Sequence, residues 1–232
     1  MSTSPIKHIT SCRLPTEHGT YQMHGYQDSR TGQEHIALVM GDITTPEPVL
    51  SRVHSECLTG DALFSQKCDC GPQLKAAMQA VAAEGRGVIV YLRQEGRGIG
   101  LIDKLRAYAL QEEGMDTLDA NVALGLPADA RSYATAAQVL RHLGVRSVEL
   151  MTNNPDKVAG LERYGVSVRS MTPTPTFANG ENLDYLRTKR DRMGHLLTGL
   201  EPTGSRTEVL PGEETADDAP WHKTDENEGE TR

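Results

Sequence analysis

The chain has 232 residues and a formal net charge of −8, with 24% charged and 4% aromatic residues. This composition is typical of a soluble globular protein, and the length allows one large domain or two small ones. No apolar run approaches the roughly 20 residues that a membrane span requires, and the N-terminus lacks the apolar stretch of a secretory signal. We therefore expect a cytoplasmic protein with no membrane partner.

The negative charge is concentrated at the C-terminal end. Residues 201–232 hold ten acidic and three basic residues, so this segment is net −7 and the rest of the chain is net −1. Because the segment also has few aliphatic residues to bury, we predict a disordered acidic tail over 201–232 and a folded domain over 1–200. The nearly neutral body and the scarcity of aromatic residues argue against a nucleic-acid partner.

The N-terminal part of the folded domain has the composition of strands. Short, partly β-branched segments separated by Gly, Pro or Asp predict strands over 21–26, 35–41 and 49–54. We expect these strands to form the antiparallel part of a sheet. The helical spacing of Leu74, Ala77, Met78 and Val81 then predicts an amphipathic helix that starts near Pro72 and ends before Gly85.

Strands and helices alternate from residue 85 onward. Apolar segments predict strands over 87–92, 147–151 and 166–168. Periodicity and caps, including Pro155 after a capping Asn154, predict helices over 100–113, 133–144, 154–165 and 181–197. Loops are expected between residues 113 and 129 and over 171–180. This alternation predicts an α/β fold, a layered α/β/α arrangement around a mixed sheet.

Three of the four cysteines lie close together in the sequence. Cys57, Cys68 and Cys70 follow the pattern C-x10-C-x-C, with no further Cys or His inside the segment. Three thiolates suit zinc and leave its fourth position for water, which favours a catalytic site over a closed structural one. Cys12 could instead close the tetrahedron. In a third interpretation the cysteines are small buried apolar residues, which the charged residues between them disfavour.

A zinc ion on three thiolates would leave a net charge of −1 and would acidify its water less than a three-histidine site. A neighbouring acid–base group is then needed to move protons. His54 and Glu56 are the candidates closest in sequence.

Arginines and glycines follow the predicted strand 87–92. The segment RQEGRGIG, residues 93–100, opens the next helix, and its backbone N–H groups and two arginines could hold a phosphate. Lys157 lies in a first helical turn, where a cation is unfavourable unless an anion is present. The alternative interpretation of residues 93–100 is a solvated loop, and the alternative interpretation of Lys157 is a solvated lysine without a ligand. Asp129 alone is compatible with an N-cap, and Tyr108 alone with core packing.

Four segments together resemble GTP cyclohydrolase II, the family that catalyses the first committed step of riboflavin synthesis. They are RVHSECLTGD (52–61), KCDCG (67–71), RQEGRGIGL (93–101) and TNNPDK (152–157). The resemblance spans about residues 8–197, so it implies that 1–200 is the catalytic domain. Many relatives also carry a dihydroxybutanone-phosphate synthase domain; this chain has no room for one, and we expect the monofunctional form.

The resemblance implies residue roles and cofactors. One zinc ion per chain is held by Cys57, Cys68 and Cys70, and Mg²⁺ accompanies the GTP triphosphate. Asp129 is implied as proton acceptor, Arg131 as nucleophile toward the α-phosphate, and Tyr108 as a neighbour of the zinc-bound water. Because arginine stays protonated in proteins, electrostatic stabilisation by Arg131 is equally acceptable. GTP contacts are implied for Arg52, Val53, His54, Ser55, Glu56, Gln73, Glu95, Gly96, Arg97, Thr117, Thr152 and Lys157.

The implied reaction is the zinc-dependent hydrolysis of GTP. It opens the guanine imidazole ring, releases formate and pyrophosphate, and gives 2,5-diamino-6-(5-phosphoribosylamino)pyrimidin-4(3H)-one. The resemblance also implies a homodimer. Two alternatives stay open: ring opening that stops at the formamidopyrimidine nucleotide, which Tyr108 argues against, and a zinc- or nucleotide-binding regulator without turnover.

Overall fold

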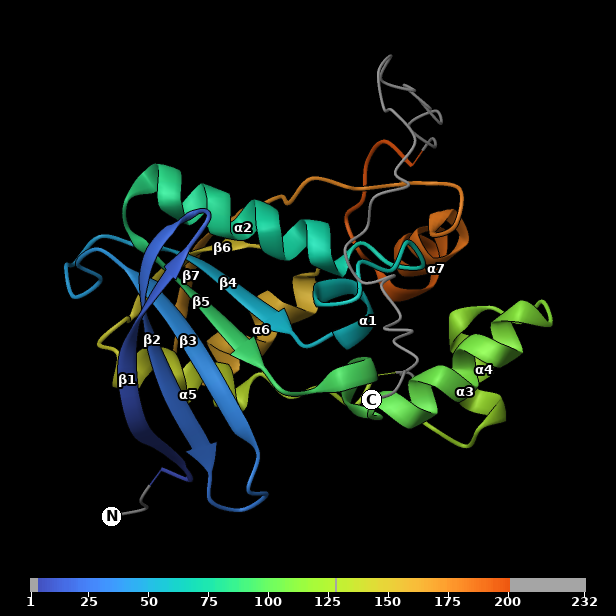
Figure 1. Ribbon diagram of the computed structural model, residues 1–232, viewed down its shortest axis with the longest axis horizontal. Helices are drawn as coiled ribbons and strands as arrows, with labels where there is room; N and C mark the ends of the chain where they lie inside the picture. The colour runs from blue at the N-terminus through green and yellow to red at the C-terminus, as the bar shows by residue number, and fades with distance from the viewer. Residues whose placement is uncertain (1–3, 128, 201–232) are drawn as a thin grey trace, which may run out of the picture.

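The computed structural model describes residues 4–127 and 129–200 (Figure 1). The acidic tail predicted over 201–232 lies outside the described residues. Among those described, no helix is both long enough and apolar enough to cross a bilayer.

A seven-stranded mixed sheet forms the centre of the molecule, in the order β1-β2-β3-β5-β4-β6-β7. The pairs β1–β2, β2–β3 and β3–β5 are antiparallel, whereas β5–β4, β4–β6 and β6–β7 are parallel. The expected mixed sheet with antiparallel N-terminal strands is thus confirmed for β2 and β3. The expectation is wrong for β4, the strand predicted over 49–54, which is parallel to both of its neighbours. The strands are β1 (Ile6–Thr16), β2 (Gly19–Asp28), β3 (Glu34–Met40), β4 (Val49–Ser55), β5 (Gly87–Leu92), β6 (Ser147–Met151) and β7 (Ser167–Thr172).

Helices cover both faces of the sheet, as Figure 1 shows for α2 on one side and for α5 and α6 on the other. Ala77 and Val81 of α2 pack with Tyr21 and Ile89 in one apolar cluster. A larger cluster on the opposite face includes Leu140 of α5 and Leu161 of α6. The layered α/β/α prediction is therefore confirmed. The helices are α1 (Leu58–Asp61), α2 (Cys70–Glu84), the 3₁₀ turn η1 (Glu95–Gly98), α3 (Leu101–Glu112), α4 (Thr117–Ala123), α5 (Ala134–His142), α6 (Pro155–Arg163) and α7 (Leu183–Met193).

Several elements differ from the sequence prediction, among them β7, which continues to Thr172 and so into the predicted 171–180 loop. β1 was not predicted, because it is an edge strand whose residues are almost all exposed after Ile6 and show no apolar alternation. α4 occupies part of the predicted 113–129 loop, where the Asp116 side chain accepts from the backbone N–H groups of Leu118 and Asp119 and caps it. The final helix is also shorter than predicted, since Gly194 in the left-handed region (φ 64°) ends it at Met193.

The strands β4, β5 and β6 are parallel, so their carboxyl ends meet at one edge of the sheet. The chain leaves these ends as the segments 56–61, 93–100 and 152–157, which hold seven of the eighteen predicted site residues. Four more, residues 52–55, lie at the end of β4 itself. In Figure 1, α3 and α4 lie beyond this edge, and they contribute no residue to the apolar clusters of the described chain. Ion pairs such as Lys104–Glu95 (2.8 Å) attach them instead.

Candidate active site

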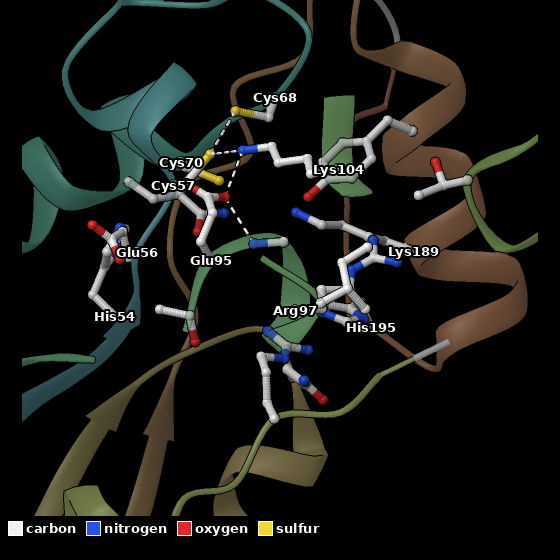
Figure 2. A pocket seen from close by; sticks show the side chains of 18 of the residues that line it. His54, Glu56, Cys57, Cys68, Cys70, Glu95, Arg97, Lys104, Lys189 and His195 are labelled. Atoms are coloured by element: carbon white, nitrogen blue, oxygen red, sulfur yellow. Dashed lines mark hydrogen bonds and ion pairs between the residues drawn. The ribbon is translucent and has the colours of Figure 1, made fainter. Parts of the chain in front are cut away.

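A pocket opens at the carboxyl ends of β4, β5 and β6, the usual ligand position in such sheets (Figure 2). It contains about 1050 Å³ of empty space with its mouth included. All the predicted site residues line it except Val53 and Asp129. Residues from α3, α4 and α7 complete the wall.

The three clustered cysteines converge at one end of this pocket, which we call the sulfur end and define by Cys57, Cys68 and Cys70. Their sulfur atoms lie within 4.8 Å of one another, and Cys57 Sγ is 3.6 Å from Cys68 Sγ. In the described part of the chain no other Cys, His, Asp or Glu joins this group. Cys12 is exposed on β1 at the sheet edge, so the alternative in which it completes the tetrahedron is wrong.

The space between the sulfurs depends on a glycine. A Cβ atom at Gly60 would lie 2.6 Å from Cys68 Sγ and 3.3 Å from Cys57 Sγ, so any side chain there would fill the centre of the group. Three converging soft ligands around a protected space are the donor set that zinc prefers. The residues present therefore fit the metal that the family resemblance implies.

A buried ammonium group lies against the sulfur end. Lys104 Nζ donates to Cys57 Sγ (3.1 Å), to Thr59 Oγ1 (2.9 Å) and to Glu95 Oε1 (2.8 Å), as Figure 2 shows for the first and last. Hydrogen bonds from Cys68 and Cys70, together with the charge of Lys104, lower the pKa of Cys57. A set of merely apolar cysteines would not attract an ammonium group, so this contact favours a thiolate site.

A second polar group connects β4 to the loop that carries Cys57. Asp61 Oδ1 lies 3.0 Å from His54 Nε2, and Asp61 Oδ2 accepts from Tyr91 OH (2.8 Å) and from the Cys57 backbone N–H (3.0 Å). Burial lowers the pKa of His54, although Asp61 opposes this shift. The other candidate proton carrier, Glu56, accepts from Arg93 Nε at 3.0 Å.

Another part of the pocket holds cations that make no ion pair; we call it the cation end and define it by Arg52, Arg97 and Lys157. None of the three makes an ion pair within the described residues. Arg52 donates to Met151 O (3.0 Å) and Gln73 Oε1 (2.6 Å), and its Nε is buried without a partner.

Lys157 reaches back from α6 to β4 and donates from Nζ to the Val53 carbonyl oxygen at 2.7 Å. Burial and the nearby charges of Arg52, Arg131 and Lys189 lower the pKa of Lys157. This contact also explains why Val53 does not line the pocket: its side chain is in the core, and only its backbone reaches the site. Uncompensated buried cations are costly, and an anion in the pocket would relieve that cost.

The turn after β5 brings Arg97 into the pocket. Gly96 and Arg97 both adopt left-handed backbone angles (φ 61° and 59°), which is strained for an arginine. Both terminal nitrogens of Arg97 are buried without a hydrogen-bond partner. Glu95, by contrast, is fully engaged: its carboxylate accepts from the Leu58 backbone N–H at 2.6 Å as well as from Lys104. Glu95 thus fixes the loops around the sulfur end.

Asp129 and Arg131 form a bidentate pair, with Arg131 Nε 2.9 Å from Asp129 Oδ1. The guanidinium faces the pocket, and the carboxylate lies outside its lining. Burial works to lower the pKa of Arg131, but the bond to Asp129 raises it above its usual value. The Arg97 carbonyl oxygen accepts from the Ala130 N–H (3.0 Å) and attaches this loop to η1.

Tyr108, Thr117 and Thr152 line the same pocket from three different elements. The Tyr108 ring lies 5.7 Å from Lys104 Nζ, and burial raises the pKa of its hydroxyl. Thr152 Oγ1 accepts from the Asn154 backbone N–H at 3.0 Å. Tyr108 therefore belongs to the pocket wall rather than to the apolar core.

Sequence reasoning missed several residues of the site. Lys104 was on a predicted helix, but nothing local indicated its contact with Cys57. Lys189 and Tyr185 of α7 also line the pocket, and Lys189 Nζ lies 2.8 Å from Asp69 Oδ1. Asp69, between two of the clustered cysteines, is completely buried and links Lys189 to Gln73 Nε2 (2.6 Å). The contacts of Lys104 and Lys189 join positions 47 and 120 residues apart, so the local sequence pattern carries no signal for them.

Comparison with known proteins shows which family the chain is similar to. The chain is 60% identical over 193 residues to "GTP cyclohydrolase-2" of Neisseria gonorrhoeae, covering 83% of this chain and 98% of that protein. It is 56% identical over 193 residues to "GTP cyclohydrolase-2" of Pseudomonas putida, covering 83% and 94%. It is 58% identical over 197 residues to "Riboflavin biosynthesis protein RibBA" of Nocardia farcinica, covering 84% of this chain and 48% of that protein.

A solved structure described as RibBX, a two-domain 3,4-dihydroxy-2-butanone 4-phosphate synthase from A. baumannii, aligns with a TM-score of 0.39 at 20% identity. It covers 73% of this chain and 41% of that one, and adds nothing to the assignment. The family model of GTP cyclohydrolase II matches residues 7–173, which include the sulfur end and the cation end. The chain therefore belongs to the GTP cyclohydrolase II family of hydrolases.

Proposed function

We propose that this enzyme hydrolyses GTP with one zinc ion on Cys57, Cys68 and Cys70 and Mg²⁺ on the substrate triphosphate. The reaction opens the guanine imidazole ring, releases formate and pyrophosphate, and gives 2,5-diamino-6-(5-phosphoribosylamino)pyrimidin-4(3H)-one, the first committed step of riboflavin synthesis. The observation that carries the proposal is one pocket that combines a three-sulfur group with three cations lacking counter-ions. The name of the relative from Neisseria gonorrhoeae supports GTP as the substrate, and the name of the relative from Nocardia farcinica supports riboflavin synthesis as the pathway.

The sulfur end is the place for the ring-opening chemistry. When bound, zinc supplies a Lewis acid that lowers the pKa of water and polarises the substrate. Lys104 offsets the negative charge of the thiolates through its contact with Cys57. Tyr108 stays protonated because burial raises its pKa, so its hydroxyl can donate a proton or a hydrogen bond to the opening ring.

The cation end is the place for the triphosphate. Arg97 offers two free terminal nitrogens, and Lys157 and Arg52 add charge without competing carboxylates. Charged donors of this kind bind phosphate oxygens strongly. Among the predicted contacts, Gln73 is held between Arg52 and Asp69, where both ends of its amide are fixed.

Arg131 acts on the phosphoanhydride as a cation. The Arg131 guanidinium donates hydrogen bonds to the Asp129 carboxylate, which raises the pKa of Arg131. A raised pKa disfavours the neutral guanidine that a nucleophile would require. Arg131 then stabilises charge that develops on the α-phosphate, with Asp129 as its orienting group and the nearest proton acceptor. Covalent attack by Arg131 on the α-phosphate would instead break its bond to the β-phosphate, expel pyrophosphate and leave the nucleoside monophosphate joined to the guanidine nitrogen. Mass spectrometry after rapid quenching would detect this adduct.

The test is turnover by the full zinc-loaded chain with GTP and Mg²⁺, measuring formate, pyrophosphate and the pyrimidine product together. One formate and one pyrophosphate per GTP are expected. Ring opening without formate would establish the formamidopyrimidine alternative, and absence of both products would establish the non-catalytic one. Cys12→Ser is the control for cysteine variants, because Cys12 lies outside the sulfur group.

A further inference from the structure

The helix α7 begins after the last residue of the family-model match, residue 173, yet it forms part of the pocket wall. Tyr185 and Lys189 come from this helix, and His195 and Leu197 come from the segment after it. In Figure 2, Lys189 and His195 lie beside Arg97 of the cation end. The C-terminal segment therefore contributes side chains to the site from outside the matched region.

The buried terminal nitrogens of Arg97 have an unusual environment. No described carboxylate pairs with Arg97, both its terminal nitrogens lack partners, and its backbone is strained. The guanidinium instead lies against an aromatic ring: Arg97 Cζ is 5.6 Å from the centre of the Tyr185 ring. That distance is within the roughly 6 Å over which a cation and an aromatic face attract each other.

The Tyr185 ring is itself held in place. Tyr185 packs against a small apolar cluster formed by Ala178, Leu186, Leu197 and Leu200, separate from the two clusters of the sheet. Lys189 Nζ lies 4.2 Å from the ring centre. Lys189 is in turn fixed by its ion pair with the fully buried Asp69.

We propose that Tyr185 is a positioning residue that holds the Arg97 guanidinium ready for the polyphosphate of the substrate. The inference rests on the proposed function, whose phosphate-binding arginine it concerns. An aromatic face attracts a guanidinium without accepting its N–H groups in regular hydrogen bonds, whereas a carboxylate would occupy them. The ring therefore fixes Arg97 and leaves its donors free for phosphate oxygens.

The test is calorimetric binding of inorganic triphosphate and of guanosine to the zinc-loaded full chain. Tyr185→Leu removes the aromatic face and should weaken triphosphate binding about tenfold, which corresponds to the upper part of the cation–π range. Guanosine binding should change little. Tyr185→Phe keeps the face and should behave as the wild type. Tyr164→Leu, the same change at a tyrosine outside the pocket, is the control.

A double-mutant cycle separates positioning from a general loosening of α7. If Tyr185 acts through Arg97, Tyr185→Leu should have almost no further effect on triphosphate binding in an Arg97→Met background. Additive losses, equal losses for guanosine, or a loss in Tyr185→Phe as large as in Tyr185→Leu would overturn the inference. Lack of GTP turnover by the wild type would instead overturn the proposed function, so the two failures are distinguishable.

Discussion

The two ends of the pocket differ in how their polar groups are satisfied. At the sulfur end, Lys104 has three partners within 3.1 Å and Asp61 ties three neighbours together. At the cation end, both terminal nitrogens of Arg97 and the Nε of Arg52 are buried without partners. Buried polar groups are normally hydrogen-bonded. The unpaired donors of the cation end therefore favour a ligand with many hydrogen-bond acceptors at that end. At the sulfur end His54 Nδ1 also lacks a partner, but the bonds of Lys104 and Asp61 hold the sulfur ligands in a fixed position.

The largest effect is expected at the sulfur end. Cys68→Ser removes one soft ligand and should reduce formate release at least about a thousandfold, the several kcal/mol that a Lewis acid contributes. Pyrophosphate release should persist in part, because Arg131 and the cation end are unchanged. Parallel assays of the two products test this. Ring opening at the wild-type rate would show that the sulfur group is not the catalytic centre.

The ion pair between Lys189 and the buried Asp69 is expected to stabilise the folded protein. Lys189→Met leaves the Asp69 carboxylate buried without its cation and should lower the free energy of unfolding by about 3 kcal/mol, as when one partner of a buried pair is removed. Denaturant unfolding measures the change. Arg187→Met is the matched control on the same helix, since its ion pair with Asp184 is exposed and should contribute little. Equal stability of the two variants would contradict a structural role for the buried pair.

A smaller, selective effect is expected at the cation end. Arg97→Met removes the free donors and should raise the KM for GTP about thirtyfold, equivalent to ~2 kcal/mol for hydrogen bonds to a charged group. Formate release at saturating GTP should fall much less, because the sulfur end is intact. Steady-state kinetics on both products give the comparison. A fall in kcat with an unchanged KM would place Arg97 in the chemistry rather than in triphosphate binding.

The smallest effect is expected from the acidic C-terminus. Every pocket residue precedes Leu200, so a chain ending at residue 200 should keep its melting temperature and turnover. The net charge of −7 over 201–232 could repel the triphosphate only weakly, and salt would screen this repulsion over about 8 Å. Loss of folding or activity on truncation would show that this segment contacts the domain.

The features that depend on local sequence pattern could be predicted from the sequence. The strands over 87–92 and 147–151 have the predicted bounds, and Asn154 caps α6 with Pro155 in its first turn. The grouping of the three sulfurs was also predictable, because short spacing and a glycine-rich turn restrict where the ligands can point. Edge strand β1 was not, since its exposed residues carry no alternation and only pairing with β2 defines it.

The residues that connect the ends of the pocket were not predictable in the same way. Lys104 meets Cys57 across 47 positions, and Lys189 meets Asp69 across 120. Such contacts are fixed by how α3 and α7 pack at the sheet edge, and neither helix carries a motif that indicates it. The roles of Asp129 and Arg131 likewise came from family resemblance, and the structure adds the ion pair between them.

We propose that the sulfur end carries out ring opening and that the cation end binds the triphosphate. Titration of the metal-depleted full chain with zinc tests this separation of roles most directly. Formate release and GTP affinity are measured in the same samples. Formate release should rise in proportion to zinc and level off at one equivalent per chain. GTP affinity should change little, because Arg52, Arg97 and Lys157 bind the triphosphate without the metal. Formate release that ignores zinc, or GTP affinity that appears only as zinc is added, would contradict the account.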